Sequence, residues 1–303
     1  DKKEKYDIVS ITDYAKKAAS TVEDYSKDDI IAVIYAQGEI AGGEGDVNVI
    51  GEGSIKRSLQ EAREDKDVKA IVLRVNSPGG SALTSELIWR EIEITKKVKP
   101  VVVSMGNYAA SGGYYIAANA DRIFAEPNTI TGSIGVFGML PNMNQLGKNI
   151  GINAEQVKTH ENASGYSVFE PIDENFKGFV LESIEKTYAT FLKRVADGRK
   201  MTTEQVDAIA QGRVWTGVDA HKLGLVDEIG GLDAAIKYAA KLGKTSSYRT
   251  ENYPEYEKNF EDLLANFTGM AMFKTKEQLL KEQLGEEGFQ MLEQIKRVKS
   301  RKG

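Results

Sequence analysis

The sequence predicts an α/β fold with mostly parallel sheets and flanking helices, and three observations support this prediction. Apolar, β-branched runs of strand length alternate with segments of helical spacing through the first half of the chain. Two of these runs end in glycine-rich turns that lead directly into a helical pattern. The alternation is typical of β-α-β units, which form parallel sheets with right-handed connections. Functional sites in such folds are expected at the carboxyl ends of the strands.

Length and composition indicate an ordinary globular chain. Its 303 residues, 41% hydrophobic and 28% charged, are enough to bury a full core without a disulfide or a metal. The formal net charge of -5, with both signs mixed along the chain, gives no indication of a nucleic-acid partner. Cysteine is absent and only His160 and His221 are present, so thiol nucleophiles and histidine-rich metal sites are excluded. We expect no cofactor.

The first half of the chain supplies the predicted strands. An apolar run over residues 30–40 predicts a buried strand followed by a flexible glycine-rich loop, and a helix is expected over 54–63. A second buried strand over 69–80 ends in a Pro-Gly-Gly turn, after which a helix resumes over 81–97. Residues 100–125 contain a third strand, a turn of small residues, a helix and a short fourth strand.

The second half is mostly helical in pattern. Apolar residues at helical spacing predict one long amphipathic helix over roughly residues 174–198. They are Phe176, Val180, Ile184, Tyr188, Phe191 and Val195. Thr202 and Gln205 have the spacing of a capping box, which opens the next helix. A weaker helical pattern, over residues 280–298, predicts a helix near the end of the chain.

These patterns divide the chain into three parts. Residues 1–26 are polar and highly charged and are predicted to form an arm before the core at 27–246, and residues 247–303 are an appended tail. No apolar stretch approaches the ~20 residues that span a bilayer. The chain also starts without a methionine or a signal sequence, so we expect a segment upstream of Asp1.

The first chemically suggestive motif is Asn76-Ser77-Pro78-Gly79-Gly80, at the end of a predicted buried strand. Two glycines in a strand-to-helix turn allow backbone N–H groups to converge, which is the arrangement that stabilises an oxyanion. Taken alone, however, the motif is more often a simple tight turn.

The second motif places Ser111 between small residues, in the segment AASGGYY after the third predicted strand. Small neighbours permit another main chain to approach the serine closely, as a nucleophile requires. On its own such a serine more often caps the following helix. The two motifs are about 30 residues apart at strand ends, and their combination favours a site.

With two further motifs the sequence becomes similar to a known family. NSPGG, SMGNYAASGGYYIAANADRIFA, TITGSIGV and GRVWTGVDAHKLGLVDEIGGLDAAI occur in this order. They resemble the signal peptide peptidase A family (SppA, protease IV) of S49 serine peptidases, in its short bacterial form. The resemblance runs from about Ile30 to Ala239 and implies a clp protease/crotonase-like fold.

The resemblance also implies a Ser/Lys dyad. Ser111 matches the nucleophile, Gly79 and Gly80 match the oxyanion hole, and Ser133 matches a serine that orients the lysine ammonium. A serine hydroxyl is a poor nucleophile until a base removes its proton. A lysine can be that base at neutral pH only if burial lowers its pKa from ~10.4 toward ~7.

The position that matches the general-base lysine is occupied by alanine. When Lys158 and Ser164 are aligned with the family's motif, Ala163 takes the lysine position, 52 residues after Ser111. We therefore expect this chain to be inactive. Two explanations remain open: an introduced substitution, which the intact remaining motifs favour, or a naturally inactive relative. Lys158 could supply the amine instead, but it matches a lysine outside the dyad.

The two histidines do not offer a better base. Related clp-type peptidases use a histidine some 25 residues after the serine, and none lies between Ser111 and His160. Polar neighbours indicate an exposed loop for His160, and His221 lies in what reads as a solvated helix followed by a strand.

The family resemblance implies a wider setting. It implies cleavage of remnant signal peptides and other apolar peptides, by a body held outside the cytoplasm through a single-pass membrane anchor. A single-copy chain is expected to assemble into a homo-oligomer, an octameric ring in which neighbours share dyads. Two alternatives stay open: a peptide-binding relative with no activity, and a crotonase-like acyl-CoA enzyme, whose pattern lacks the serine nucleophile.

Overall fold

A computed structural model describes residues 29–160, 163 and 165–254. The chain divides into two compact units, residues 1–254 and 255–303, and the described residues belong to the first. The predicted N-terminal arm and the predicted helix at 280–298 both lie outside the described residues.

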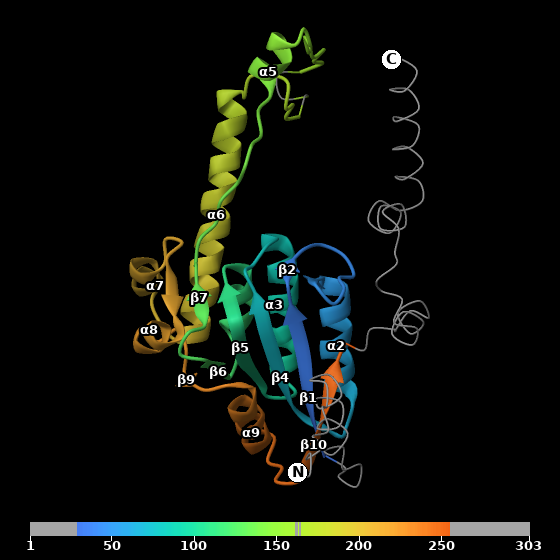
Figure 1. The fold of residues 1–303 in the computed structure, drawn as a ribbon, viewed down its shortest axis with the longest axis vertical. Coiled ribbons are helices and arrows are strands. Elements are labelled where there is room, and N and C mark those ends of the chain that lie inside the picture. Colours follow the sequence, from blue (N-terminus) through green and yellow to red (C-terminus); the bar gives the residue numbers. More distant parts are fainter. Residues whose placement is uncertain (1–28, 161–162, 164, 255–303) are drawn as a thin grey trace, which may run out of the picture. The chain divides into compact units, whose positions relative to one another are not determined.

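The described residues form a mostly parallel sheet in the order β10-β1-β4-β5-β6-β9, with β7 paired to β5 and β8 antiparallel to β7 (Figure 1). This confirms the predicted α/β class with flanking helices. The strands of the main path are β1 (Asp29–Gln37), β4 (Val68–Ser77), β5 (Val101–Ala110), β6 (Arg122–Ala125), β9 (Glu228–Ile229) and β10 (Tyr248–Tyr253). The short remaining strands are β2 (Glu39–Ile40), β3 (Val49–Ile50), β7 (Ile130–Gly132) and β8 (Val214–Thr216).

Both faces of the central strands are covered, which explains their unbroken apolar sequence. On β1, Ile30, Ala32 and Ile34 join the larger core cluster, whereas Ile31 and Val33 belong to a smaller cluster on the other side. The larger cluster packs against α2 (Glu52–Glu64), α3 (Ala82–Lys96) and α4 (Gly112–Ala117). The smaller one packs against α9 (Leu232–Leu242).

The sheet extends beyond the predicted end of the core. β10 pairs in parallel with β1, from Asp29↔Tyr248 to Ile34↔Tyr253, and the first compact unit continues to Pro254. The predicted boundary at residue 247 is therefore too early. The strand reads YRTENY and is only partly buried, because it lies at the edge of the sheet. An edge strand of this kind carries no apolar run that periodicity could detect.

The long helix α6 (Glu174–Arg199) confirms the helix predicted over 174–198. It begins where the Asp173 carboxylate accepts hydrogen bonds from the first turn, and it ends at Lys200 in the left-handed conformation. Only Phe191, Val195 and Ala196 are buried in it. Tyr188 and Leu192 also pack against the core, so the apolar residues of the N-terminal half of the helix face something other than the sheet.

That partner is the segment of described residues between 138 and 172, here called the distal segment, which includes α5 (Asn144–Asn149). Tyr166 stacks on Phe176 at a ring-centroid distance of 5.8 Å, and Gly138 lies against Ile184. The N-terminal part of α6 and the distal segment project away from the sheet (Figure 1).

After α6 the chain returns to the sheet through two short helices. Thr202 and Gln205 form the predicted capping box of α7 (Thr203–Ile209). α8 (Gly217–Lys222) follows β8 and leads to the fully buried Leu225. No helix of the part described here is both long and apolar enough to cross a membrane.

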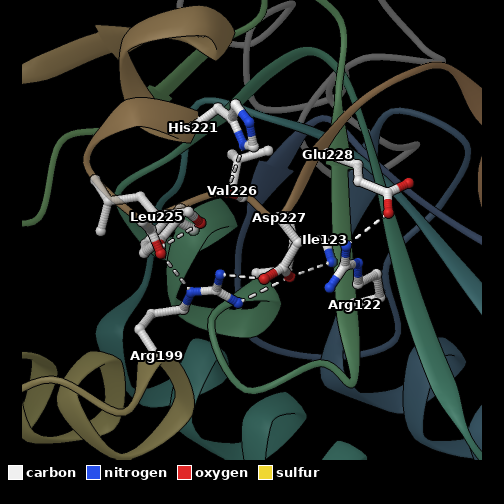
Figure 2. A network of polar contacts seen from close by, with 10 residues as sticks. Arg122, Ile123, Arg199, His221, Leu225, Val226, Asp227 and Glu228 are labelled. Atoms are coloured by element: carbon white, nitrogen blue, oxygen red, sulfur yellow. Dashed lines mark hydrogen bonds and ion pairs between the residues drawn. The ribbon is translucent and has the colours of Figure 1, made fainter.

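A partly buried ion pair joins the end of α6 to Asp227, the residue before β9 (Figure 2). Arg199 donates to both carboxylate oxygens of Asp227, at 2.7 and 3.1 Å, and to the carbonyl of Gly224 at 2.9 Å. The same carboxylate accepts from the backbone N–H of Ile123. Burial raises the pKa of Asp227, but the hydrogen bonds and charge of Arg199 outweigh it, so the pKa lies below its usual value.

The two glycines of α6 give opposite expectations for substitution by alanine. A β-carbon on Gly198 would overlap the carbonyl of Ala118, whereas one on Gly178 would meet nothing within 4 Å. Gly178→Ala should stabilise the fold by up to about 1 kcal/mol through helix propensity. Gly198→Ala should destabilise it despite the same gain in propensity. Urea unfolding of both variants checks this, and equal shifts would contradict the close approach of α6 to α4.

Loss of the Asp227 charge should destabilise the fold in a pH-dependent way. Asp227→Asn leaves Arg199 buried without its counter-ion, at a cost of about 3 kcal/mol at neutral pH. Because the folded pKa is below the unfolded value of ~3.9, this stabilisation is present above that value and is lost as the pH falls through the folded pKa. Urea titrations between neutral pH and acid pH should therefore converge for the two proteins.

Asp197→Asn is the matched control, because its pair with Lys193 is exposed on α6. It should change stability by less than about 0.5 kcal/mol at every pH. A control variant as unstable as Asp227→Asn would mean that burial of the ion pair is not the cause.

Candidate active site

Ser111 lies where β5 ends and α4 begins. Its N–H donates to the carbonyl of Gly132 at 2.9 Å, and its own carbonyl accepts from Tyr115 N–H at 2.9 Å. It occupies the N-cap position of α4, yet its side chain accepts no hydrogen bond from the helix. Among the described residues no group is hydrogen-bonded to its hydroxyl. Helix capping, the ordinary role of a serine at this position, therefore does not account for it.

The backbone at Ser111 is strained. Its φ of 51 and ψ of -120 fall in a region that L-residues rarely adopt. The turn directs the serine away from the β5 ladder while its backbone stays bonded to β7. Strain of this kind clusters at functional sites, where surrounding structure holds it in place.

Gly79 contacts Ser111 directly. A β-carbon on Gly79 would lie 2.7 Å from Cβ of Ser111 and 2.8 Å from N of Gly112, and its φ is 108. The Gly79 N–H donates to Oγ of the fully buried Ser77 at 3.1 Å. Only a glycine fits this position, because both the close approach and the positive φ exclude a side chain.

Gly80 is held by β2. Ile40 N–H donates to the carbonyl of Gly79 at 2.8 Å, and Ser81 N–H donates to the carbonyl of Ile40 at 2.7 Å. In this parallel bridge the Gly80 N–H points away from Ile40. Its nitrogen lies 3.3 Å from where a β-carbon on Gly112 would be. The backbones of Gly80 and Gly112 are therefore close neighbours beside Ser111.

Ser133 follows β7 as Ser111 follows β5. Ala110 pairs with Gly132 in the parallel ladder, so the two serines come directly after paired residues. Ser133 also has a positive φ of 48, and its N–H donates to the carbonyl of Arg213 at 2.7 Å. The structure thus brings Ser111, Ser133, Gly79 and Gly80 together at the carboxyl ends of β4, β5 and β7.

A cluster of side chains from α3, α4 and α6 packs beside these strand ends. The Tyr115 hydroxyl donates to Glu86, which also accepts from Arg194 at 2.5 Å. The Tyr115 ring packs on Phe191 at 4.7 Å. Burial, together with the hydrogen bond to Glu86, raises the pKa of Tyr115 well above its usual value. The first turn of α4 is in this way tied to α6.

A groove of about 590 Å³ runs beside the cluster, between the start of α3 and the middle of α6. Leu83 and Tyr115 line it near the glycine turn, and Phe179 and Thr187 line it on α6. Leu83 is 70% exposed. The groove gives an apolar surface that begins one helical turn from Gly80.

Ala163 lies far from Ser111 in the same chain. It belongs to the distal segment, three residues before Tyr166, which stacks on Phe176 at the start of α6. Phe191, which packs on α4, is 15 residues farther along the same unbroken helix. That separation corresponds to roughly 22 Å at 1.5 Å per residue. A lysine at 163 would not reach Ser111 of its own chain in this arrangement.

The other candidate bases are also distant. Lys158 and His160 belong to the distal segment, and His160 is exposed. His221 is on α8, where its Nδ1 lies 3.2 Å from the carbonyl of Val226 (Figure 2). Among the described residues no group of His, Cys, Asp and Glu side chains is arranged to hold a metal ion.

Sequence reasoning missed two contributors to the site, Ile40 and Ser77, whereas it expected an amide beside Ser111, the position of Gly112. Ser77 lies inside the NSPGG motif, so its position was visible but its hydrogen bond to Gly79 was not. Ile40 contacts Gly80 through a long-range strand pairing, for which the sequence carries no local signal.

Comparison with known proteins identifies the family. The model of peptidase family S49 matches residues 93–246, which include Ser111, Ser133 and the Ala163 position. The chain belongs to peptidase family S49. The match begins after Gly79 and Gly80, so the glycine turn is placed by the structure and not by the family model.

Several curated proteins resemble most of the chain. It is 45% identical over 239 residues to Protease 4 of Haemophilus influenzae, covering 78% of this chain and 39% of that protein. It is 41% identical over 216 residues to the chloroplastic serine protease SPPA of Arabidopsis thaliana, covering 70% and 32%. A putative protease of Synechocystis is 35% identical over 196 residues, covering 64% and 70%. The chain thus spans about two fifths or less of the longer S49 relatives.

The strained backbone of Ser111 gives a test that does not depend on activity. Ser111→Gly should be more stable than Ser111→Ala by about 1 kcal/mol, because only glycine adopts this φ and ψ without strain. Both variants remove the hydroxyl, so the difference isolates the backbone. Urea unfolding checks the order of the two variants, and a less stable glycine variant would contradict the strained turn.

Proposed function

We propose that this S49 chain has the machinery of a serine endopeptidase of the Ser/Lys type, with Ser111 as its nucleophile. The observation that supports this most directly is that Ser111 lies on a strained turn against Gly79 and that its hydroxyl does not cap the following helix. Ser133 would orient the lysine ammonium, and the N–H groups of Gly80 and Gly112 would form the oxyanion hole. Gly79 would give this turn its close approach to Ser111, because its own N–H is bonded to Ser77.

The chemistry follows from these positions. A neutral lysine amine takes the hydroxyl proton of Ser111 while Oγ bonds to the carbonyl carbon of the scissile peptide. Negative charge develops on the carbonyl oxygen, where the amides of the glycine turn stabilise it. The ammonium then returns the proton to the leaving amine as the C–N bond breaks. Water, activated by the same amine, hydrolyses the resulting ester of Ser111.

The present chain should be nearly inactive, because Ala163 stands at the position of the general-base lysine. The distance between the distal segment and Ser111 supports a shared site, in which position 163 of one subunit serves Ser111 of its neighbour. We propose a homo-oligomer, an octameric ring, for this reason.

Exposed apolar side chains in and beside the distal segment support such an assembly. They are Phe137, Met139, Met143, Leu146, Ile150, Ile152, Val157, Phe169, Phe179 and Leu181. Apolar surface of this extent on a folded unit is typical of a protein interface.

The proposed substrates are apolar peptides, above all remnants of signal peptides. The groove beside Leu83 and Tyr115 supports apolar side chains next to the scissile bond. One S49 relative, from Enterococcus faecium, carries the name putative signal peptide peptidase SppA. We propose that the catalytic core acts outside the cytoplasm, at the cell membrane, and is held there by a single-pass anchor.

A second candidate function is peptide binding without hydrolysis. The observation that favours it is Ala163 itself, since a chain without a general base can still hold a peptide in the groove. The two candidates differ in what restoration of the lysine does.

Ala163→Lys should create peptidase activity that depends on Ser111. The measurement is hydrolysis of a short apolar fluorogenic peptide by the unmodified chain, by Ala163→Lys, and by Ala163→Lys with Ser111→Ala. We expect turnover only from the second. Silence from all three would favour the peptide-binding function, or a different source of the lysine.

A mixing experiment separates a shared site from one within a single chain. Co-expression of the unmodified chain with the Ser111→Ala, Ala163→Lys double variant should restore activity, because one supplies the serine and the other the lysine. Each protein alone should be inactive. A particle of 33.3 kDa by light scattering at assay concentration would contradict the oligomer.

A further inference from the structure

A second cavity lies at the other end of the sheet from Ser111. It has a volume of about 560 Å³ and lies between α3, the end of α6 and the turn that joins α4 to β6. The turn precedes Arg122, the first residue of β6, and Asp121 N–H bonds to Val101, the first residue of β5. Ser111 follows the last residue of β5, and the chain runs from there through α4 to this turn, so the two places lie at opposite ends of β5. We call it the polar cavity.

Buried polar atoms without partners concentrate on its walls. Of the five such side-chain atoms among the described residues, three belong to residues that line the polar cavity: Nε1 of Trp89, Oδ1 of Asn119 and Nε of Arg122. Asn119 is only 4% exposed, and its Nδ2 donates to Glu93 at 2.6 Å, which leaves Oδ1 as an acceptor. Buried polar groups are normally satisfied, so three beside one cavity indicate a missing partner there.

The walls are fixed by ion pairs and do not depend on that partner. Arg194 bonds to Glu86 outside the cavity and lies 3.8 Å above the Trp89 ring. Arg122 bonds to Glu228 at 2.6 Å (Figure 2). These contacts hold Trp89 and Arg122 in place while leaving Nε1 and Nε without an acceptor. A site built in advance in this way loses little conformational freedom when a ligand enters.

The chemistry of the walls selects a carboxylate with an adjacent N–H group. Two unpartnered atoms, on Trp89 and Arg122, are donors, and the one on Asn119 is an acceptor. Five lysine and arginine residues line the polar cavity against four aspartate and glutamate residues, and Arg122 and Arg194 are paired with Glu228 and Glu86, so the two unpartnered donors, and not the net charge, select the ligand. The end of a peptide, with its terminal carboxylate and last backbone N–H, offers both kinds of group. The volume is in the range of small-ligand sites.

We propose that the polar cavity binds short peptides by their free C-terminal carboxylate. The carboxylate accepts from Trp89 Nε1 and Arg122 Nε, and an N–H of the peptide donates to Asn119 Oδ1. This site is separate from Ser111, and the proposal does not depend on hydrolysis, because binding alone is measured.

The decisive comparison is between two ligands on the unmodified full chain. Isothermal titration calorimetry with acetyl-trialanine and with its C-terminal amide changes only the carboxylate. The acid should bind about tenfold more tightly or better, as expected for charge-assisted hydrogen bonds. Equal affinities, or no binding of either peptide in the millimolar range, would overturn the proposal. Displacement of the acid by equimolar inorganic phosphate would also overturn it, since the site would then recognise any anion.

Variants locate the binding. Trp89→Phe removes the N–H but keeps a ring beneath Arg194, and it should weaken the acid about tenfold toward the affinity of the amide. Ser111→Ala should leave the affinity unchanged, and a loss there would mean that the peptide occupies the candidate active site instead. The melting temperatures of both variants control for folding.

Fluorescence gives a second readout at the cavity itself. The chain has two tryptophans, Trp89 and Trp215. In a Trp215→Phe protein the remaining emission reports the polar cavity, and the peptide acid should shift it. In the Trp89→Phe protein the emission of Trp215 should stay constant. A shift confined to Trp215 would place the ligand elsewhere and contradict the proposal.

Discussion

The contact between Gly79 and Ser111 is the constraint on which the rest of the site depends. It brings the ends of two neighbouring parallel strands within van der Waals distance, which no residue with a side chain at 79 would permit. Ser111 can keep its strained backbone because β7 holds its N–H and α4 holds its carbonyl. Gly80 keeps its amide direction because Ile40 uses the groups on either side of it. Hydrogen bonds to neighbouring strands therefore stabilise the strained turn, and the absence of a side chain at Gly79 permits the close approach of the two strand ends.

Much of this arrangement could be predicted from local sequence patterns. The buried strands, the length of α6 and the capping box at Thr202 depend on periodicity and on residue types a few positions apart. The placement of Ser111 and Gly79 at strand ends follows from the same patterns. β10 could not be found in this way, because an edge strand that is only partly buried has no apolar signature. The Ile40 bridge and the polar cavity arise from residues distant in sequence, and no local pattern encodes them.

The apolar residues of α6 show how one pattern can have two structural causes. Phe191 and Val195 continue the core, as amphipathic spacing predicts, whereas Phe176 and Val180 face the distal segment. Periodicity alone identifies the helix and its apolar side, but it does not say which neighbour covers each part of that side. The position of Ala163 follows from this division. The residue that we propose to stand at the position of the lysine is held far from Ser111 of its own chain by a helix that the sequence predicts correctly.

The ends of α6 also differ in how they are held. Its last turns are clamped by the Glu86 and Asp227 ion pairs, by Phe191 against Tyr115, and by Gly198 against Ala118. Its first turns contact the distal segment through Phe176 and Val180. In geometry the helix is therefore an arm whose fixed end, its pivot, lies beside the turn that carries Ser111. A small tilt at the pivot displaces the tip in proportion to the length of the arm. Packing around Phe191 and Gly198 consequently sets the reach of the tip, even though those residues are far from anything that the tip would touch.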